Sequence, residues 1–218
     1  MTRAVVFDLD GVLVDSEPVW EEVRRGLVAE RGGHWGPDAQ RRIMGMSTPE
    51  WAAYLSGELG VGLPPDEVAT TVIDRMVARY TEHVPLMDGA VDAVHRFAAR
   101  WPLGLASSSP PRLIETVLQS AGLRDCFQVV MSTEQVQRGK PAPDIYLAVT
   151  AALGCPPGEC AAVEDSSNGL RSAAAAGLRV IAIPHPRYPP DPDALARASL
   201  VRPSLAALTA DALDWSGT

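Results

Sequence analysis

The chain has 218 residues, of which 46% are hydrophobic, 21% are charged and 6% are aromatic. This composition is typical of a folded globular protein and excludes a disordered or fibrous chain. A net charge of −8 at pH 7 disfavours nonspecific binding to nucleic acid or to an anionic membrane, because both require a basic surface. A chain of this length predicts one full core with a smaller insertion.

The three cysteines, Cys126, Cys155 and Cys160, form no CxxC pair, and their odd number predicts no disulfide framework. Acidic residues interrupt the first fifteen positions, and no run of about 18 apolar residues occurs, so we expect neither a secretory signal nor a membrane span. We therefore expect a cytoplasmic protein, a monomer or homodimer, without membrane or nucleic-acid partners.

Strand and helix patterns alternate along most of the chain. Apolar runs rich in strand-forming residues occupy 3–9, 101–107, 126–132, 160–165 and 178–184. Helical patterns that end near a glycine lie between later strands, at 110–123, 143–154 and 167–178. This alternation predicts an α/β fold with a Rossmann-like parallel sheet covered by helices on both faces.

The alternation stops after the first strand, where four helical patterns follow one another at 17–32, 37–44, 48–59 and 65–84. We expect an inserted four-helix cap domain over residues 16–84 and a core domain formed by residues 1–15 and 85–218. The two connections, near Asp15 and near Asp88-Gly89, are candidate hinges.

The first strand ends in the sequence VVFDLDGVLVDSE, which places two carboxylates beside buried residues. Period-two alternation puts Asp8 and Asp10 on one side of the extended chain, and Gly11 allows a sharp turn after them. Ligands of open parallel sheets bind outside the carboxyl ends of the strands, which is where these residues fall. Two carboxylates at this place indicate a metal, a cation or a chemical step.

Other strand ends carry complementary groups. Ser107 ends a strand and can hold a phosphate oxygen, while Ser109, followed by two prolines, is interpreted as the N-cap of a helix. Glu164 and Asp165 end another strand and, with Asp8, offer the oxygen ligands that Mg²⁺ prefers. Lys140 is the only lysine among nineteen lysine and arginine residues, which indicates a place for a compact ammonium, although one residue does not exclude chance.

Four motifs, DLDGVLVDSE, SSS, GKPAPD and EDSSNG, resemble in order and spacing those of the haloacid dehalogenase superfamily of phosphotransferases. The resemblance covers essentially the whole chain. The helical insertion resembles the cap of the superfamily's β-phosphoglucomutase and sugar-phosphatase branch. The four motifs together are specific, whereas DxD alone is a weak signal.

The resemblance implies that Asp8 is a nucleophile that becomes an aspartyl phosphate and that Asp10 is the general acid and base. It also implies an Mg²⁺ site and a phosphate site. The implied metal ligands are Asp8, Asp10 through its backbone carbonyl, Glu164 and Asp165. The implied phosphate-binding residues are Ser107, Ser108 and Lys140.

Substrate selection is expected in the cap, with Glu17, Trp20, Ser47 and Thr48 as candidate substrate-binding residues. Trp20 can stack on a sugar ring or pack the cap core, and both interpretations stay open. Glu17 lies at a helix start, together with Asp15 and Ser16, so helix capping and a functional role are equally open.

The expected function is hydrolysis of a small phosphorylated metabolite, a sugar phosphate, by an Mg²⁺-dependent phosphatase. The alternatives are a β-phosphoglucomutase-like phosphomutase, a phosphoglycolate-type phosphatase and a noncatalytic module. The mutases carry cap cations, but Trp20, Met44 and Thr48 occupy the aligned positions here, which favours hydrolysis. The presence of Asp10 argues against a dehalogenase, and a cap without lysine argues against phosphonate cleavage.

Overall fold

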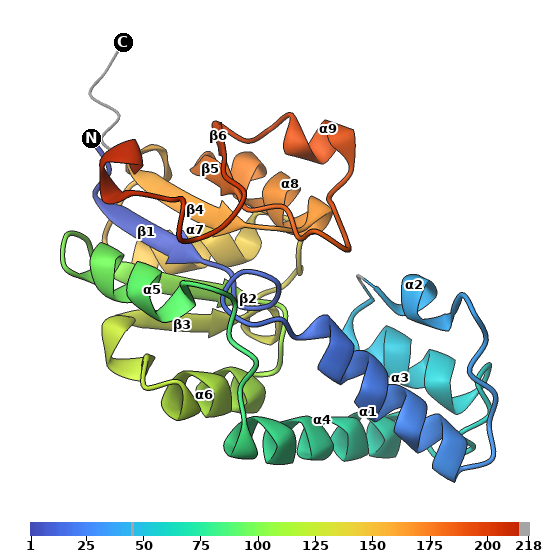
Figure 1. Cartoon of the computed structure of the whole chain (residues 1–218). Coiled ribbons are helices and arrows are strands. Elements are labelled where there is room, and N and C mark those ends of the chain that lie inside the picture. The colour runs from blue at the N-terminus through green and yellow to red at the C-terminus, as the bar shows by residue number, and fades with distance from the viewer. Residues whose placement is uncertain (45, 214–218) are drawn as a thin grey trace. The chain divides into compact units, whose positions relative to one another are not determined.

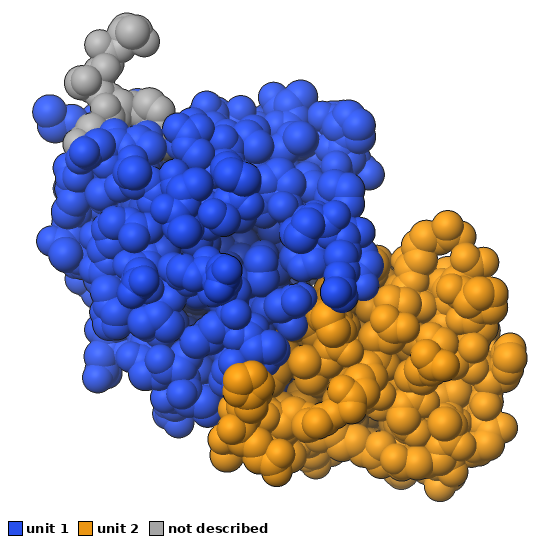
Figure 2. All heavy atoms as spheres, in the orientation of Figure 1, with its two compact units in different colours: residues 1–15, 84–218 blue, residues 16–83 orange. Residues whose placement is uncertain are grey.

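The computed structural model describes residues 1–44 and 46–213. The chain divides into two compact units, coloured separately in Figure 2: unit 1 comprises Met1–Asp15 and Val84–Thr218, and unit 2 comprises Ser16–His83. The assignment of the helical unit as a cap domain stays a prediction.

Unit 1 is built on a parallel sheet of six strands in the order β3-β2-β1-β4-β5-β6 (Figure 1). The strands are β1 (Ala4–Phe7), β2 (Leu103–Ser107), β3 (Val129–Ser132), β4 (Cys160–Glu164), β5 (Arg179–Ala182) and β6 (Leu200–Val201). The predicted α/β, Rossmann-like fold class is confirmed. The sequence did not predict β6, because two residues at a sheet edge carry no readable periodicity.

Helices cover both faces of this sheet. Unit 1 contains α5 (Ala90–Ala98), α6 (Pro111–Ser120), α7 (Asp144–Ala152), α8 (Ser167–Ala175) and α9 (Pro192–Leu195). Val6 of β1 belongs to a buried cluster with Ile145 of α7 and Leu170 of α8. The next residue, Phe7, points to the opposite face, where its ring meets Phe97 of α5 edge-on at 5.8 Å. Alternate side chains of β1 therefore pack into two apolar layers, which explains why the strand is continuously hydrophobic.

Short 3₁₀ helices complete the unit, at η1 (Arg124–Cys126), η2 (Thr133–Gln135), η3 (Pro157–Glu159) and η4 (Ala210–Leu213). Within the described residues, no helix combines the length and the apolar character needed to cross a membrane.

Unit 2 is helical, with α1 (Glu17–Glu30), α2 (Ala39–Ile43), α3 (Thr48–Ser56) and α4 (Pro65–Glu82). Prolines occupy the first turns of α1, α3 and α4, where a missing N–H removes no helical hydrogen bond. The apolar face of α4 is fully buried at Val72 and Met76. Trp20 of α1 and Trp51 of α3 pack with their ring centroids 6.1 Å apart.

Candidate active site

The carboxyl ends of three neighbouring strands bring the predicted core residues together. Asp8 follows the last residue of β1, Ser107 ends β2 and Glu164 ends β4, with Asp165 next along the chain. Because β2, β1 and β4 are adjacent and parallel, these positions share one edge of the sheet. Asp8, Ser107, Glu164 and Asp165 are all buried.

A tight loop after β1 shapes this edge. Gly11 has a φ of 76°, a conformation that residues with side chains rarely adopt, and its N–H donates to the Val14 carbonyl at 2.8 Å. A Cβ atom at Gly11 would lie 2.0 Å from Oδ2 of Asp165. Glycine is therefore required both for the turn and for the space that Asp165 occupies.

Lys140, on the segment between β3 and α7, carries the positive charge of the site. Its ammonium donates to Oδ1 of Asp8 at 2.9 Å, to the Ala106 carbonyl at 2.9 Å and to Oε1 of Glu164 at 2.6 Å. Burial lowers the pKa of Lys140, but the charges of Asp8 and Glu164 outweigh this effect and raise it. The ammonium is thus charged, with each of its three hydrogens donated to an acceptor.

Carboxylates outnumber this cation. Asp8, Glu164 and Asp165 each place one oxygen so that the three atoms lie within 4.8 Å of one another. Burial, followed by the charge of Glu164, raises the pKa of Asp8 to about 8 despite the opposing effect of Lys140. Burial, followed by the charges of Asp8 and Glu164, raises the pKa of Asp165 well above its usual value.

The acidic cluster fits a divalent cation. Within the described residues, the buried Oδ1 atom of Asp165 has no hydrogen-bond partner. An unpaired carboxylate oxygen beside two further carboxylates is costly unless a cation compensates the charge. Hard oxygen ligands of this kind suit Mg²⁺.

Glu164 differs from the two aspartates because the protein already satisfies both of its oxygens. Oε1 accepts from Lys140 and from the Tyr146 hydroxyl, each at 2.6 Å. Oε2 accepts from the Asp165 N–H at 3.2 Å and from the Ser166 hydroxyl at 3.3 Å. A carboxylate offers about four accepting positions. The geometry therefore favours Asp8 and Asp165 over Glu164 as direct metal ligands, and Glu164 as the anchor of Lys140.

Two serine hydroxyls hold Asp10. Its Oδ2 atom accepts from Ser109 at 2.7 Å and from Ser107 at 3.2 Å. The interpretation of Ser109 as a helix N-cap is wrong, because α6 begins at Pro111 with Pro110 in the cap position. The hydroxyl of Ser109 donates instead to the side chain of Asp10, on the loop that follows β1. Local sequence carries no signal for this contact, since it joins two strand ends. Ser108, beside them, is exposed.

A family model for haloacid dehalogenase-like hydrolases matches residues 2–177. The chain belongs to the haloacid dehalogenase-like hydrolase family. Several curated relatives that cover most of the chain are phosphatases by name, and this family member is a phosphatase. Its core motifs meet at one sheet edge, as described above.

Named relatives of this family member include two carbohydrate-related phosphatases. Hexitol phosphatase B of Escherichia coli strain K12 is 36% identical over 195 residues, which are 87% of this chain and 86% of the relative. The phosphorylated carbohydrates phosphatase of Thermotoga maritima is 32% identical over 185 residues, covering 84% and 86% of the two chains. The crystal structure of CbbY from Rhodobacter sphaeroides in complex with phosphate superposes with a TM-score of 0.87, at 28% identity, over 98% of this chain and 100% of that chain.

The four predicted substrate-binding residues of this hydrolase lie in unit 2. Glu17 accepts a hydrogen bond from Nε2 of Gln40 at 2.7 Å, and Trp20, 7% exposed, packs close to Trp51. Ser47 donates its N–H at 2.7 Å and its hydroxyl at 2.6 Å to the Glu50 carboxylate, and Thr48 begins α3. The substrate role of all four residues stays a prediction.

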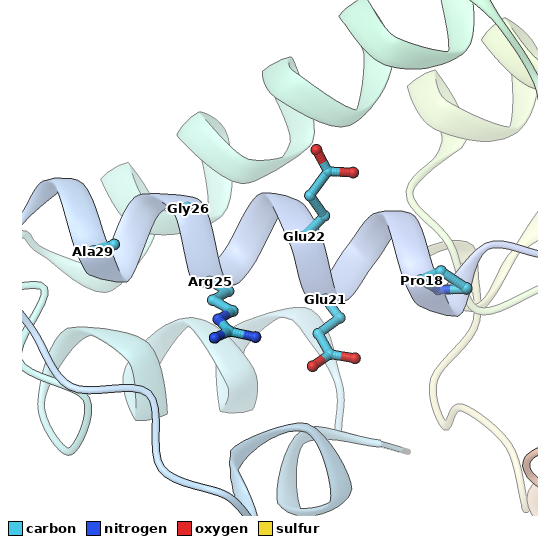
Figure 3. Close-up of a pocket in the computed structure, with 6 residues that line it drawn as sticks. All are labelled: Pro18, Glu21, Glu22, Arg25, Gly26 and Ala29. Carbon is cyan, nitrogen blue, oxygen red and sulfur yellow. The ribbon is translucent and has the colours of Figure 1, made fainter.

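Unit 2 of the hydrolase also has a hollow of about 530 Å³ beside α1, lined by Pro18, Glu21, Glu22, Arg25, Gly26 and Ala29. Figure 3 shows Glu22 on one side of the helix and Glu21 with Arg25 on the other. Glu22 forms an ion pair with Arg79 of α4. These residues were not predicted as site residues, and the contact between α1 and α4 gives Glu22 a structural role.

Proposed function

We propose that the chain hydrolyses a small sugar phosphate with the aid of Mg²⁺ and through an aspartyl phosphate on Asp8. The observation that carries the proposal is the buried Asp8 carboxylate, which lies against Lys140 and shares an acidic cluster with the unpartnered oxygen of Asp165. The carbohydrate phosphatases among the relatives support the choice of substrate class.

In the first step, an oxygen of Asp8 attacks phosphorus and the bond between phosphorus and the ester oxygen breaks. Asp10 gives its proton to the departing oxygen, so that the product leaves as an alcohol. The Ser107 hydroxyl and the backbone near Ser108 hold the phosphoryl oxygens, and the positive charge of Lys140 attracts them. Splitting the displacement at a covalent intermediate replaces one difficult step by two easier ones.

In the second step, Asp10 takes a proton from water while the water oxygen attacks phosphorus. The bond between phosphorus and Asp8 breaks, which releases inorganic phosphate and restores the Asp8 carboxylate. The hydroxyl of Ser109 orients Asp10 for both proton transfers, since it donates to the Oδ2 atom of Asp10 at 2.7 Å. The bond from Ser107 to the same atom is longer, at 3.2 Å, and the Ser107 hydroxyl donates to the phosphoryl group when substrate is bound.

The cation would be held by Asp8, the Asp10 carbonyl and Asp165, with Glu164 as a further predicted ligand. When bound, it supplies positive charge that offsets the negative charge of the phosphoryl group. The pKa values of Asp8 and Asp165, both raised by burial, support the need for such compensation.

We further propose that unit 2 is a cap that selects the sugar. Its candidate residues are Glu17, Trp20, Ser47 and Thr48. Among these, Thr48 offers the first test, because it is half-buried at the start of α3. A Thr48→Ala variant with an unchanged KM for a good substrate would remove this residue from the proposal.

The function is tested by phosphate release from hexitol phosphates, fructose 1-phosphate, β-glucose 1-phosphate and phosphoglycolate, with Mg²⁺ or with EDTA. We expect metal-dependent release from sugar phosphates by the native chain and none by Asp8→Asn. Conversion of β-glucose 1-phosphate to the 6-phosphate without release would instead establish a mutase. Preferential release from phosphoglycolate would overturn the assignment to sugars.

A further inference from the structure

Tyr146 of α7 reaches the active site although no motif marks it as a site residue. It is fully buried and packs in the apolar cluster that includes Ile145 and Val149. In the sequence it reads as a core position of the helix. Its hydroxyl, however, donates to Oε1 of Glu164 at 2.6 Å.

The hydroxyl distinguishes Tyr146 from an ordinary core aromatic residue. A phenylalanine would fill the same apolar space without bringing a polar atom into the core. A buried hydroxyl is costly unless it is hydrogen-bonded, and its partner here is a fully buried carboxylate. The bond therefore has a role that packing alone does not require.

That role concerns Lys140, because Tyr146 and Lys140 share one acceptor atom. Oε1 of Glu164 accepts from both residues, and the same ammonium donates to Oδ1 of Asp8. The Lys140 ammonium also lies 5.2 Å from the centroid of the Tyr146 ring, within range of a cation–π contact. The hydroxyl of Tyr146, through Glu164, and the ring of Tyr146 therefore both constrain the orientation of the Lys140 side chain.

We infer that Tyr146 is a positioning residue whose hydroxyl fixes Glu164, so that Lys140 stays directed at Asp8 and at the phosphoryl group. The inference deepens the proposed function and rests on it for the role of Lys140 in phosphoryl transfer. Tyr146 itself does not touch the reacting atoms and acts through Glu164 and Lys140.

The test compares Tyr146→Phe with Thr150→Val, which removes another buried hydroxyl from the same helix. Thr150 donates to the backbone carbonyls of Tyr146 and Leu147 at 2.9 and 3.1 Å, so its loss leaves Glu164 untouched. Lys140 is the only lysine of the chain, so isotope-labelled lysine gives a single side-chain ammonium signal in NMR spectra.

We expect Tyr146→Phe to shift the Lys140 signal and to speed exchange of its ammonium protons. We also expect kcat to fall about tenfold, the size of one lost hydrogen bond to a charged group, with KM changed less than kcat. Thr150→Val should leave the Lys140 signal and kcat at native values.

Native values for both the Lys140 signal and kcat in Tyr146→Phe would overturn the inference. Equal changes in the two variants would also overturn it, because they would indicate general loosening of α7. If the native chain released no phosphate from any ester, the proposed function would fail, while the Lys140 signal would still decide whether Tyr146 positions the lysine.

Discussion

Gly169, in the first turn of α8, leaves room for the Glu164 carboxylate. A Cβ atom at this position would lie 1.9 Å from Oε2 and 2.1 Å from Oε1 of Glu164. Real Cβ atoms essentially never approach other heavy atoms closer than 3.0 Å, so Gly169→Ala must displace the carboxylate by about 1 Å or more.

Such a displacement has a calculable cost, because four donors hold Glu164. Lys140 and Tyr146 lie at 2.6 Å from Oε1, and a shift of this size lengthens both bonds beyond hydrogen-bond range. At about 1.5–3 kcal/mol for each bond to a charged group, the loss is about 3–6 kcal/mol. Replacing glycine by alanine in a helix returns about 1 kcal/mol. The expected decrease in the free energy of unfolding is therefore about 2–5 kcal/mol.

Chemical denaturation measures this difference, with Gly26→Ala as the matched control. Gly26 also lies within a helix, α1, but a Cβ atom at this position would meet no atom within 4 Å, so we expect a gain of about 0.5–1 kcal/mol there. The tight packing of Glu164 against α8 would be refuted if Gly169→Ala were at least as stable as the native chain and kept its kcat.

Three further outcomes are expected. Ser109→Ala removes the 2.7 Å bond to Asp10 and should lower kcat about 10–100-fold with little change in thermal stability; steady-state kinetics giving native kcat would contradict this role. Glu50→Gln should destabilise the chain by no more than about 1 kcal/mol at pH 7. The Ser47 hydroxyl and N–H lower the pKa of the Glu50 carboxyl group in the folded chain. The stabilisation by this capping contact is therefore present above the pKa of Glu50 in the unfolded chain and is lost as pH falls through its lower pKa in the folded chain. Urea titrations at pH 3 to 7 would reveal this loss. Removal of divalent ions by EDTA should lower the melting temperature, because Asp165 loses its compensating charge, and calorimetry showing no Mg²⁺ effect would contradict a metal site.

The residues at the strand ends were predictable because two rules combine there. Alternation along a strand fixes which side chains share a side, and parallel strands bring their carboxyl ends to one edge. Asp8, Glu164 and Asp165 meet as these rules require, and Lys140 joins them. Ser107, at the end of the neighbouring strand, donates to Asp10. Their catalytic and metal-binding roles stay predictions.

Contacts that depend on side-chain packing between elements were not predictable. Ser109 was interpreted as a helix cap and Tyr146 was not predicted as a site residue, yet their hydroxyls donate to Asp10 and Glu164. Each contact joins side chains of different elements, which local patterns do not encode. Trp20, for which packing and sugar stacking were both open, is buried at 7% exposure among unit 2 residues, and its role toward a substrate stays untested.

The covalent intermediate on Asp8 is the central claim, and rapid acid quenching during turnover tests it most directly. The native chain would be mixed with Mg²⁺ and its best sugar phosphate, quenched within one turnover and digested for mass spectrometry. The account predicts one added phosphoryl group on the peptide that contains Asp8, and none in Asp8→Asn. Phosphate release with an unmodified Asp8 peptide, or with the phosphoryl group on another residue, would contradict it.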